Sequence, residues 1–123
     1  MNFVKNMVSL LVVAMMAAPI VGAPASTNST STSIKWVMID TYAFPPVTTL
    51  APGDQLTFDW NGTFHDVYQF PNKTAYNDCD FTNATKIATT GPVTINVTEG
   101  LTYYGCSVGV HCSTRGQKVA VIV

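Results

Sequence analysis

The chain of 123 residues is 47% hydrophobic and 11% charged, with a formal net charge of −1 at pH 7. This length suits a single domain with one hydrophobic core. Because its six Lys and Arg residues form no basic cluster, the composition argues against nucleic acid as a partner.

Residues 1–25 are predicted to be a signal peptide. Lys5 stands near the start, an apolar run follows over residues 7–18, and residues 23–25 (APA) supply the small side chains that signal peptidase requires. The apolar run is shorter than the roughly 18 residues expected of a membrane span. Removal of 25 residues from 123 would leave 98, with five Lys and Arg against seven Asp and Glu. We therefore expect a secreted, extracellular protein of the cell wall or matrix, without a stable membrane anchor.

Residues 26–33 are predicted to form a flexible leader before a folded domain at residues 34–123. The leader is rich in Ser and Thr and has no large apolar side chain to bury, so burial cannot offset the entropy lost on ordering it.

Short β-strands are predicted throughout the folded domain. Apolar and polar side chains alternate in residues 34–38, 56–60 and 93–97, while residues 101–105 and 117–123 are interpreted as the last two strands. Turn residues recur between these segments. The pattern predicts an antiparallel sandwich or barrel, with a helical turn near residues 74–77.

Five Asn-x-Ser/Thr sequons mark positions able to carry glycans, which suits a secreted protein. The fifth falls on the polar face of its predicted strand. The predicted glycosylation sites are Asn28, Asn61, Asn72, Asn83 and Asn96.

Three cysteines cannot all pair within one chain in an oxidising compartment. A reduced thiol survives best there when a metal holds it as thiolate, and Cys106 stands five residues before His111 in a predicted loop. His65 is the other histidine of the chain. Neighbouring side chains of an extended segment point to opposite sides, so if His111 binds a metal, Cys112 faces away and is free to pair with Cys79. We therefore predict metal ligation by His65, Cys106 and His111.

Other interpretations of these donors remain open. Cys106 could pair with Cys112, which would leave Cys79 free and abolish the metal site. Zinc accepts the same donors, although structural zinc usually has four strong ligands. Two His, one Cys and a weak axial donor instead match a blue-copper site.

The axial donor is predicted by elimination. Met38 is the sole methionine after the signal peptide and lies far from the loop in sequence, whereas Gln117 follows His111 by six residues. An amide oxygen favours Cu(II), so Gln117 predicts a lower reduction potential than a Met ligand would give.

Several segments, in this order, resemble the phytocyanins, specifically the Gln-ligated stellacyanin type. The resemblance implies an all-β, cupredoxin-like two-sheet Greek-key sandwich or barrel with one type 1 copper ion. It also implies ligation by His65, Cys106, His111 and Gln117, and a disulfide between Cys79 and Cys112. The segments are residues 53–60 (GDQLTFDW), 65–67 (HDV), 76–79 (YNDC), 103–106 (YYGC), 111–112 (HC) and 116–118 (GQK).

Two features depart from the family pattern. Six steps separate His111 from Gln117, where the family usually has five. Asp66 stands where the family has an Asn that supports the metal ligands.

The expected function is one-electron transfer by a monomer that is not an enzyme. Its redox partner, a protein or a small molecule, is not identified by the sequence. The alternatives are an extracellular structural, adhesion or signalling glycoprotein in which copper is dispensable, and a copper-binding scavenger.

Overall fold

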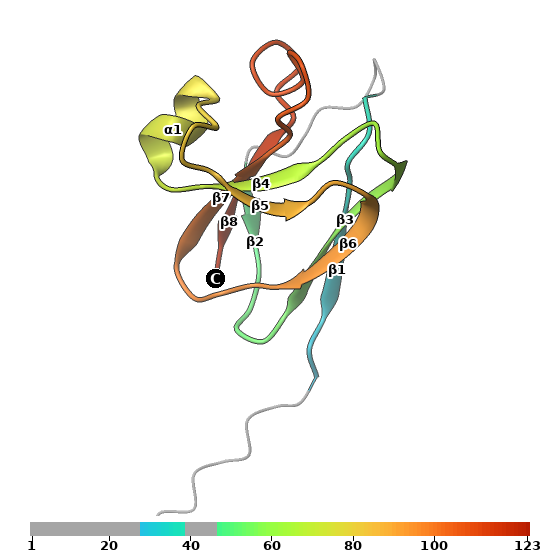
Figure 1. The fold of residues 1–123 in the computed structure, drawn as a ribbon. Helices are drawn as coiled ribbons and strands as arrows, with labels where there is room; N and C mark the ends of the chain where they lie inside the picture. The colour runs from blue at the N-terminus through green and yellow to red at the C-terminus, as the bar shows by residue number, and fades with distance from the viewer. Residues whose placement is uncertain (1–27, 39–46) are drawn as a thin grey trace, which may run out of the picture.

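The computed structural model describes residues 28–38 and 47–123, which form two β-sheets packed face to face with one short helix (Figure 1). The predicted signal peptide lies outside the described residues. One sheet has the strand order β1-β3-β6 and the other has the order β2-β8-β7-β4-β5. The elements are β1 (Ser31–Lys35), β2 (Val47–Thr49), β3 (Gln55–Gly62), β4 (Val67–Phe70), α1 (Lys73–Asp78), β5 (Thr85–Ala88), β6 (Gly91–Asn96), β7 (Leu101–Gly105) and β8 (Lys118–Ile122).

The core lies between the two sheets and follows the alternation in the sequence. Leu56, Phe58 and Trp60 of β3 are buried, while the residues between them face outward or are half-buried. Val119 and Val121 of β8 meet them from the other sheet in the same core cluster. The predicted all-β sandwich is thereby confirmed, because alternate residues of β3 and of β8 supply buried side chains to the core between the sheets.

The sheets are mixed: among the described residues, four strand pairs are antiparallel, as expected, and two are parallel, which the sequence analysis did not predict. β1 pairs with β3 in parallel, and β2 pairs with β8 in parallel. The chain enters the five-stranded sheet at β2 before it returns to the first sheet at β3. Two strands joined by such a crossover can run in the same direction, which a tight hairpin does not allow.

The flexible leader was predicted over residues 26–33, but the last part of this range belongs to a β-strand. Ser31–Ser33, assigned to the leader, belong to β1 and pair with residues 55–57. Just before them, the Thr30 amide donates to Asp54 Oδ1 at 2.8 Å. Backbone pairing orders this stretch without any large apolar side chain, a contribution that the Ser/Thr composition conceals. The folded domain therefore begins near Thr30 and not at Ile34.

The helix and the loop between β7 and β8 lie at the same end of the sandwich (Figure 1). The predicted helical turn is confirmed as α1. Asn72 caps the N-terminus of this helix, because its Oδ1 accepts a hydrogen bond from the Ala75 N–H at 2.9 Å. No helix among the described residues is long and apolar enough to cross a membrane.

Leu56→Ala tests the assignment of the core. Because Leu56 is fully buried between the sheets, its truncation should lower the free energy of unfolding by about 2–5 kcal/mol. The same change at Leu101, which is 51% exposed, should cost less than about 1 kcal/mol. Urea unfolding of both variants measures the difference, and equal losses would contradict this core.

Candidate metal centre

His65 is held in the connection between β3 and β4 by the residue that follows it. The indole Nε1 of Trp36 donates to the backbone oxygen of Asp66 at 2.8 Å, and this hydrogen bond is buried. Trp36 itself packs edge-on against Phe58, with ring centroids 4.9 Å apart. The position of His65 therefore depends on the same aromatic core that joins the sheets.

Cys106, His111 and Gln117 belong to one loop whose backbone bonds to itself. Cys106 follows the last residue of β7, and its N–H donates to the Gln117 oxygen at 3.0 Å. The Gln117 N–H in turn donates to the His111 oxygen at 2.9 Å, and the His111 N–H donates to Val108 at 3.0 Å. These bonds fix the three residues relative to one another.

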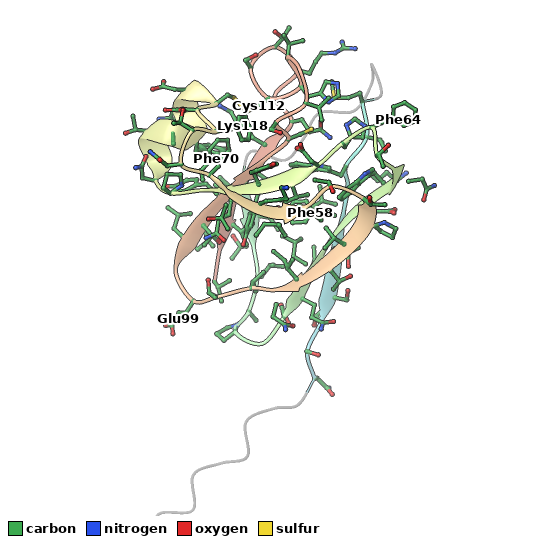
Figure 2. The ribbon with its side chains drawn as sticks, in the orientation of Figure 1. Phe58, Phe64, Phe70, Glu99, Cys112 and Lys118 are labelled. Atoms are coloured by element: carbon green, nitrogen blue, oxygen red, sulfur yellow. A yellow bond between two sulfur atoms is a disulfide. The ribbon has the colours of Figure 1, made fainter. Side chains whose placement is uncertain are left out.

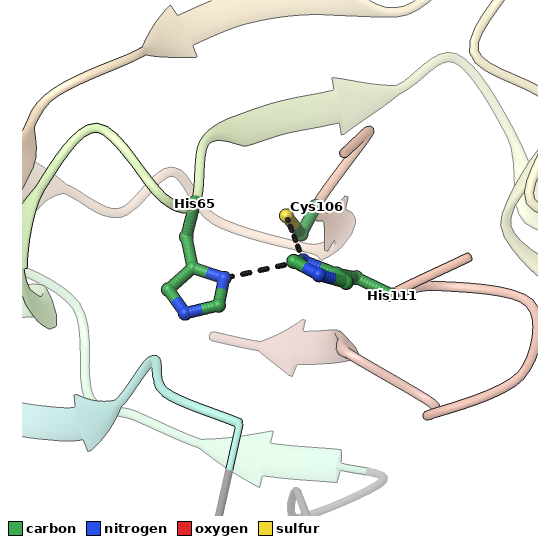
Figure 3. A group of neighbouring side chains, drawn as sticks. All are labelled: His65, Cys106 and His111. Carbon is green, nitrogen blue, oxygen red and sulfur yellow. Dashed lines mark hydrogen bonds between the residues drawn. The ribbon is translucent and has the colours of Figure 1, made fainter. Parts of the chain in front are cut away.

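The donor atoms of His65, Cys106 and His111 converge (Figure 3). All three lie within 4.8 Å of one another. The two Nδ1 atoms are 3.3 Å apart, and Cys106 Sγ is 3.5 Å from His111 Nδ1. His65 and Cys106 are buried, whereas His111 is half-buried. The structure thus brings together the three predicted strong ligands, from two segments far apart in sequence.

Gln117 is fully buried, yet neither atom of its amide meets hydrogen-bond geometry. A buried polar group without a partner costs about 1–3 kcal/mol, so such a group needs an explanation. The side chain is near enough to His65 to oppose the lowering of that residue's pKa. Gly116, on which a five-step count from His111 would land, is exposed and has no donor side chain. A buried Gln117 amide without a hydrogen-bond partner, next to His65, therefore suits the role of a weak axial donor.

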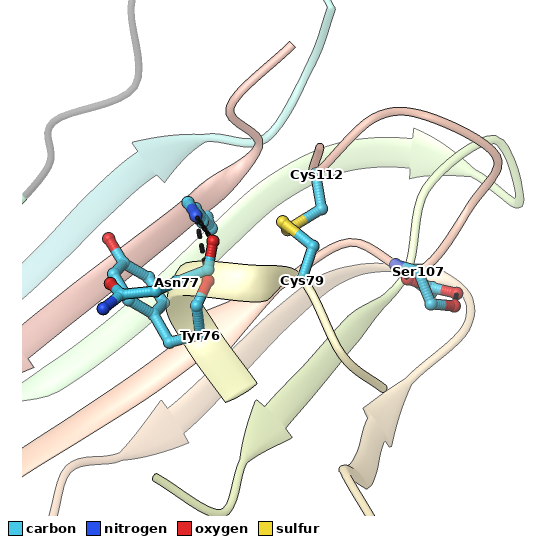
Figure 4. Close-up of a disulfide and its surroundings, with 7 residues drawn as sticks. Tyr76, Asn77, Cys79, Ser107 and Cys112 are labelled. Atoms are coloured by element: carbon cyan, nitrogen blue, oxygen red, sulfur yellow. Dashed lines mark hydrogen bonds between the residues drawn. A yellow bond between two sulfur atoms is a disulfide. The ribbon is translucent and has the colours of Figure 1, made fainter. Parts of the chain in front are cut away.

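The disulfide joins Cys79 to Cys112, as predicted (Figure 4). Cys79 caps α1 in a left-handed conformation, with φ of 50°, and its N–H bonds to the oxygens of Ala75 and Tyr76. Cys106 is a free, buried thiol. The alternative pairing of Cys106 with Cys112 is therefore wrong, and the thiol that the metal needs is available.

Burial sets the protonation of the donors. It raises the pKa of the Cys106 thiol to about 11, although backbone hydrogen bonds from Asp66 and Val108 act in the opposite direction. Burial, and then the neighbouring His111, lower the pKa of His65. At neutral pH the cluster therefore offers a protonated thiol and a neutral His65 imidazole. A metal must displace the thiol proton to bind.

The donor set discriminates between metals. Two imidazoles and one thiolate are strong ligands for both copper and zinc, but structural zinc usually has a fourth strong ligand. A neutral amide is a weak donor, and a long axial contact of this kind is typical of blue copper. The residues present therefore fit copper better than structural zinc.

Asp66 was singled out from the sequence, but three other residues next to the donors, Ser107, Phe64 and Val110, were not assigned a role. Ser107, directly after Cys106, bonds to Asp66. Phe64 and Val110, which directly precede the two histidines, are 79% and 58% exposed. A large apolar residue directly before each of the two histidines was the available signal.

Proton release should accompany copper loading. At about pH 7.5 the metal-free protein should release about one proton per Cu(II), because the Cys106 thiol, with its pKa raised to about 11, must become a thiolate. Apparent affinity should accordingly rise up to tenfold per pH unit below that pKa. A pH indicator in weakly buffered solution measures the release. Cys106→Ser should lose this proton, and equal release from both proteins would refute its origin.

The chain matches a family model described as a plastocyanin-like domain over residues 36–117. It is 35% identical over 77 residues to cucumber peeling cupredoxin of Cucumis sativus, covering 61% of this chain and 56% of that protein. It is also 35% identical over 72 residues to blue copper protein 1b of Medicago truncatula, covering 58% and 44%. The chain thus spans about half the length of these curated relatives.

Solved structures give the same assignment. Cucumber stellacyanin with Cu²⁺ is similar with a TM-score of 0.54 and 32% identity, covering 62% of this chain and 72% of that one. Spinach plantacyanin has a TM-score of 0.59 and 25% identity, covering 76% and 99%. The predicted cofactor, one copper ion, agrees with this family and with the donor cluster. The chain belongs to the plastocyanin-like domain family and is a phytocyanin with a cupredoxin fold.

Proposed function

We propose that this protein is a secreted one-electron carrier in which His65, Cys106 and His111 bind copper and Gln117 is the axial donor. The observation that carries the proposal is the convergence of two imidazole nitrogens and one thiol sulfur within 4.8 Å beside an unpartnered amide. Bound there, copper would supply a Cu(II)/Cu(I) couple. The family assignment supports a carrier and not an enzyme.

The protein's contribution is a donor set that is held in place from several sides. Backbone bonds close the loop from Cys106 to Gln117, and the disulfide ties Cys112 to the end of α1. Burial of His65 and Cys106 limits access of water to the donors. A site with little freedom to rearrange suits a carrier, because it changes little when an electron arrives or leaves.

His111 is the proposed point of electron entry and exit. It is half-buried, whereas His65 and Cys106 are buried. The exposed side chains of Phe64 and Val110 adjoin the two histidines in sequence and extend the surface near them with apolar area. Such an apolar surface favours transient contact with a redox partner and does not require opposite charges on that partner. Either a protein or a small molecule could be that partner.

Secretion and glycosylation are supported by the positions of the sequons. All five sequon asparagines are exposed. Asn72 uses Oδ1 to cap α1, and Nδ2, the atom to which a glycan attaches, is not needed for that bond. These positions suit a glycosylated extracellular protein.

Cys106→Ser tests the copper site directly. The wild-type protein with one Cu(II) should show an intense visible band that one electron equivalent bleaches, because the band requires the Cys106 thiolate. The variant should lose the band. Ser113→Ala, a matched change at an exposed position of the same loop, should keep it. A colourless wild-type protein would favour the structural or signalling glycoprotein. Copper bound without reversible reduction would favour the scavenger.

Gln117→Met tests the axial donor. A thioether is softer than an amide oxygen and favours Cu(I), so the reduction potential should rise by at least about 59 mV, a tenfold change in relative affinity for a one-electron couple. Met38→Leu changes the competing candidate and should leave the potential within error. Protein-film voltammetry measures both variants. A shift in Met38→Leu alone would transfer the axial role to Met38.

A further inference from the structure

Asp66 connects the two segments that supply the donor atoms. Its Oδ1 accepts the Ser107 N–H at 2.6 Å, and its Oδ2 accepts the Ser107 hydroxyl at 2.5 Å. Its backbone oxygen accepts the Trp36 indole N–H at 2.8 Å. Asp66 directly follows His65, and Ser107 directly follows Cys106. The carboxylate therefore fixes the neighbours of two candidate ligands to each other.

A carboxylate suits both Ser107 donors better than an amide would. Each carboxylate oxygen accepts one hydrogen bond, whereas an amide has one acceptor oxygen and one donor nitrogen. An Asn could accept the Ser107 N–H, but its nitrogen could not accept the hydroxyl proton. The paired acceptance from N–H and O–H explains why an acid functions at this position, where the family has an Asn.

The same carboxylate brings a negative charge close to the donor cluster. Asp66 is only 8% exposed, and both groups that donate to its side chain are neutral. Asp66 directly follows His65, and its carboxylate bonds to Ser107, the residue directly after Cys106, so its charge lies close to both donors. A nearby negative charge favours the more positive oxidation state of a metal, which for copper is Cu(II). Burial strengthens such an interaction because the effective dielectric constant is lower than in water.

We propose that Asp66 is a positioning residue that holds Cys106 through Ser107, and that its negative charge lowers the reduction potential of the centre by favouring Cu(II) over Cu(I). The inference rests on the proposed copper function. The Gln117 amide is expected to lower the reduction potential as a ligand. Asp66 would lower the same potential through its charge, without binding the metal. The two influences together predict a centre that is difficult to reduce.

The Ser107 hydroxyl distinguishes the effect of charge from that of positioning. Because this hydroxyl donates to Oδ2, it partly compensates the carboxylate charge. Removing the hydroxyl leaves the charge less compensated and should stabilise Cu(II). Neutralising Asp66 should do the reverse. A residue that acted only by holding the loop would give shifts of the same sign in both variants, since both loosen the same contact.

The test compares Asp66→Asn, Ser107→Ala and Glu99→Gln in the full secreted protein. Glu99 is exposed at the end of the molecule opposite Cys112, so Glu99→Gln removes one charge far from the centre (Figure 2). Voltammetry should give an upward shift of about 59 mV for Asp66→Asn, which is a tenfold loss in the ratio of Cu(II) to Cu(I) affinity. Ser107→Ala should shift downward, and Glu99→Gln should shift by much less than Asp66→Asn. Thermal unfolding of the metal-free proteins should give a lower midpoint for Asp66→Asn and for Ser107→Ala than for Glu99→Gln.

Each outcome has a defined meaning. Opposite shifts in Asp66→Asn and Ser107→Ala support the proposal. Shifts of the same sign, no shift in Asp66→Asn, or equal shifts in Asp66→Asn and Glu99→Gln overturn it. If Asp66→Asn does not fold, the lowered potential of Ser107→Ala decides alone, and an unchanged or raised value overturns the proposal. A wild-type protein without a blue band would refute the copper function itself, which is a separate result.

Discussion

The hydrogen bonds of Asp66 join the parts of the chain on which the candidate centre depends. His65 comes from the connection between β3 and β4, whereas Cys106 lies 41 positions further along, after β7. The Trp36 indole donates to the backbone oxygen of Asp66 and anchors it in the core, and Ser107 donates to the Asp66 carboxylate. The pairing of β4 with β7 already brings the two segments close together, but it does not reach His65 or Cys106 themselves. With the hydrogen bonds of Asp66, their separation is fixed by a few short bonds.

The other side of the loop is fixed by α1. The disulfide ties its C-terminal cap, Cys79, to the residue after His111. Lys118, which begins β8 directly after Gln117, donates from its ammonium to the backbone oxygens of Tyr76 and Asn77 at 2.9 and 3.1 Å. The same ammonium lies 4.7 Å from the centroid of the Tyr76 ring. The helix therefore braces the loop near both His111 and Gln117, which explains why so short a helix matters to the site.

The sequence was sufficient where each choice had few alternatives. Two histidines and one surplus cysteine left little freedom in the strong ligands, and alternation in β3 predicted its buried face. It was insufficient where tertiary pairing decides. Ser31–Ser33 carry no apolar signal, yet backbone bonds to β3 order them. The parallel pairings depend on which sheet the chain enters next. Asp66 stood out as a departure from a family pattern, but its partner Ser107 emerges only when β4 and β7 lie side by side.

The metal-free site carries costs that a bound metal would remove together. Burial raises the pKa of Cys106 to about 11 and so disfavours the thiolate that the metal requires. Gln117 is buried without a hydrogen-bond partner, at a cost of about 1–3 kcal/mol. The two histidine Nδ1 atoms face each other at 3.3 Å, where at most one can carry a proton between them. A cation at their midst would compensate the thiolate, accept the amide oxygen and use both imidazole lone pairs. The sandwich, the disulfide and the hydrogen bonds of Asp66 hold the donors in this unfavourable metal-free arrangement. The free energy of metal binding would offset its cost.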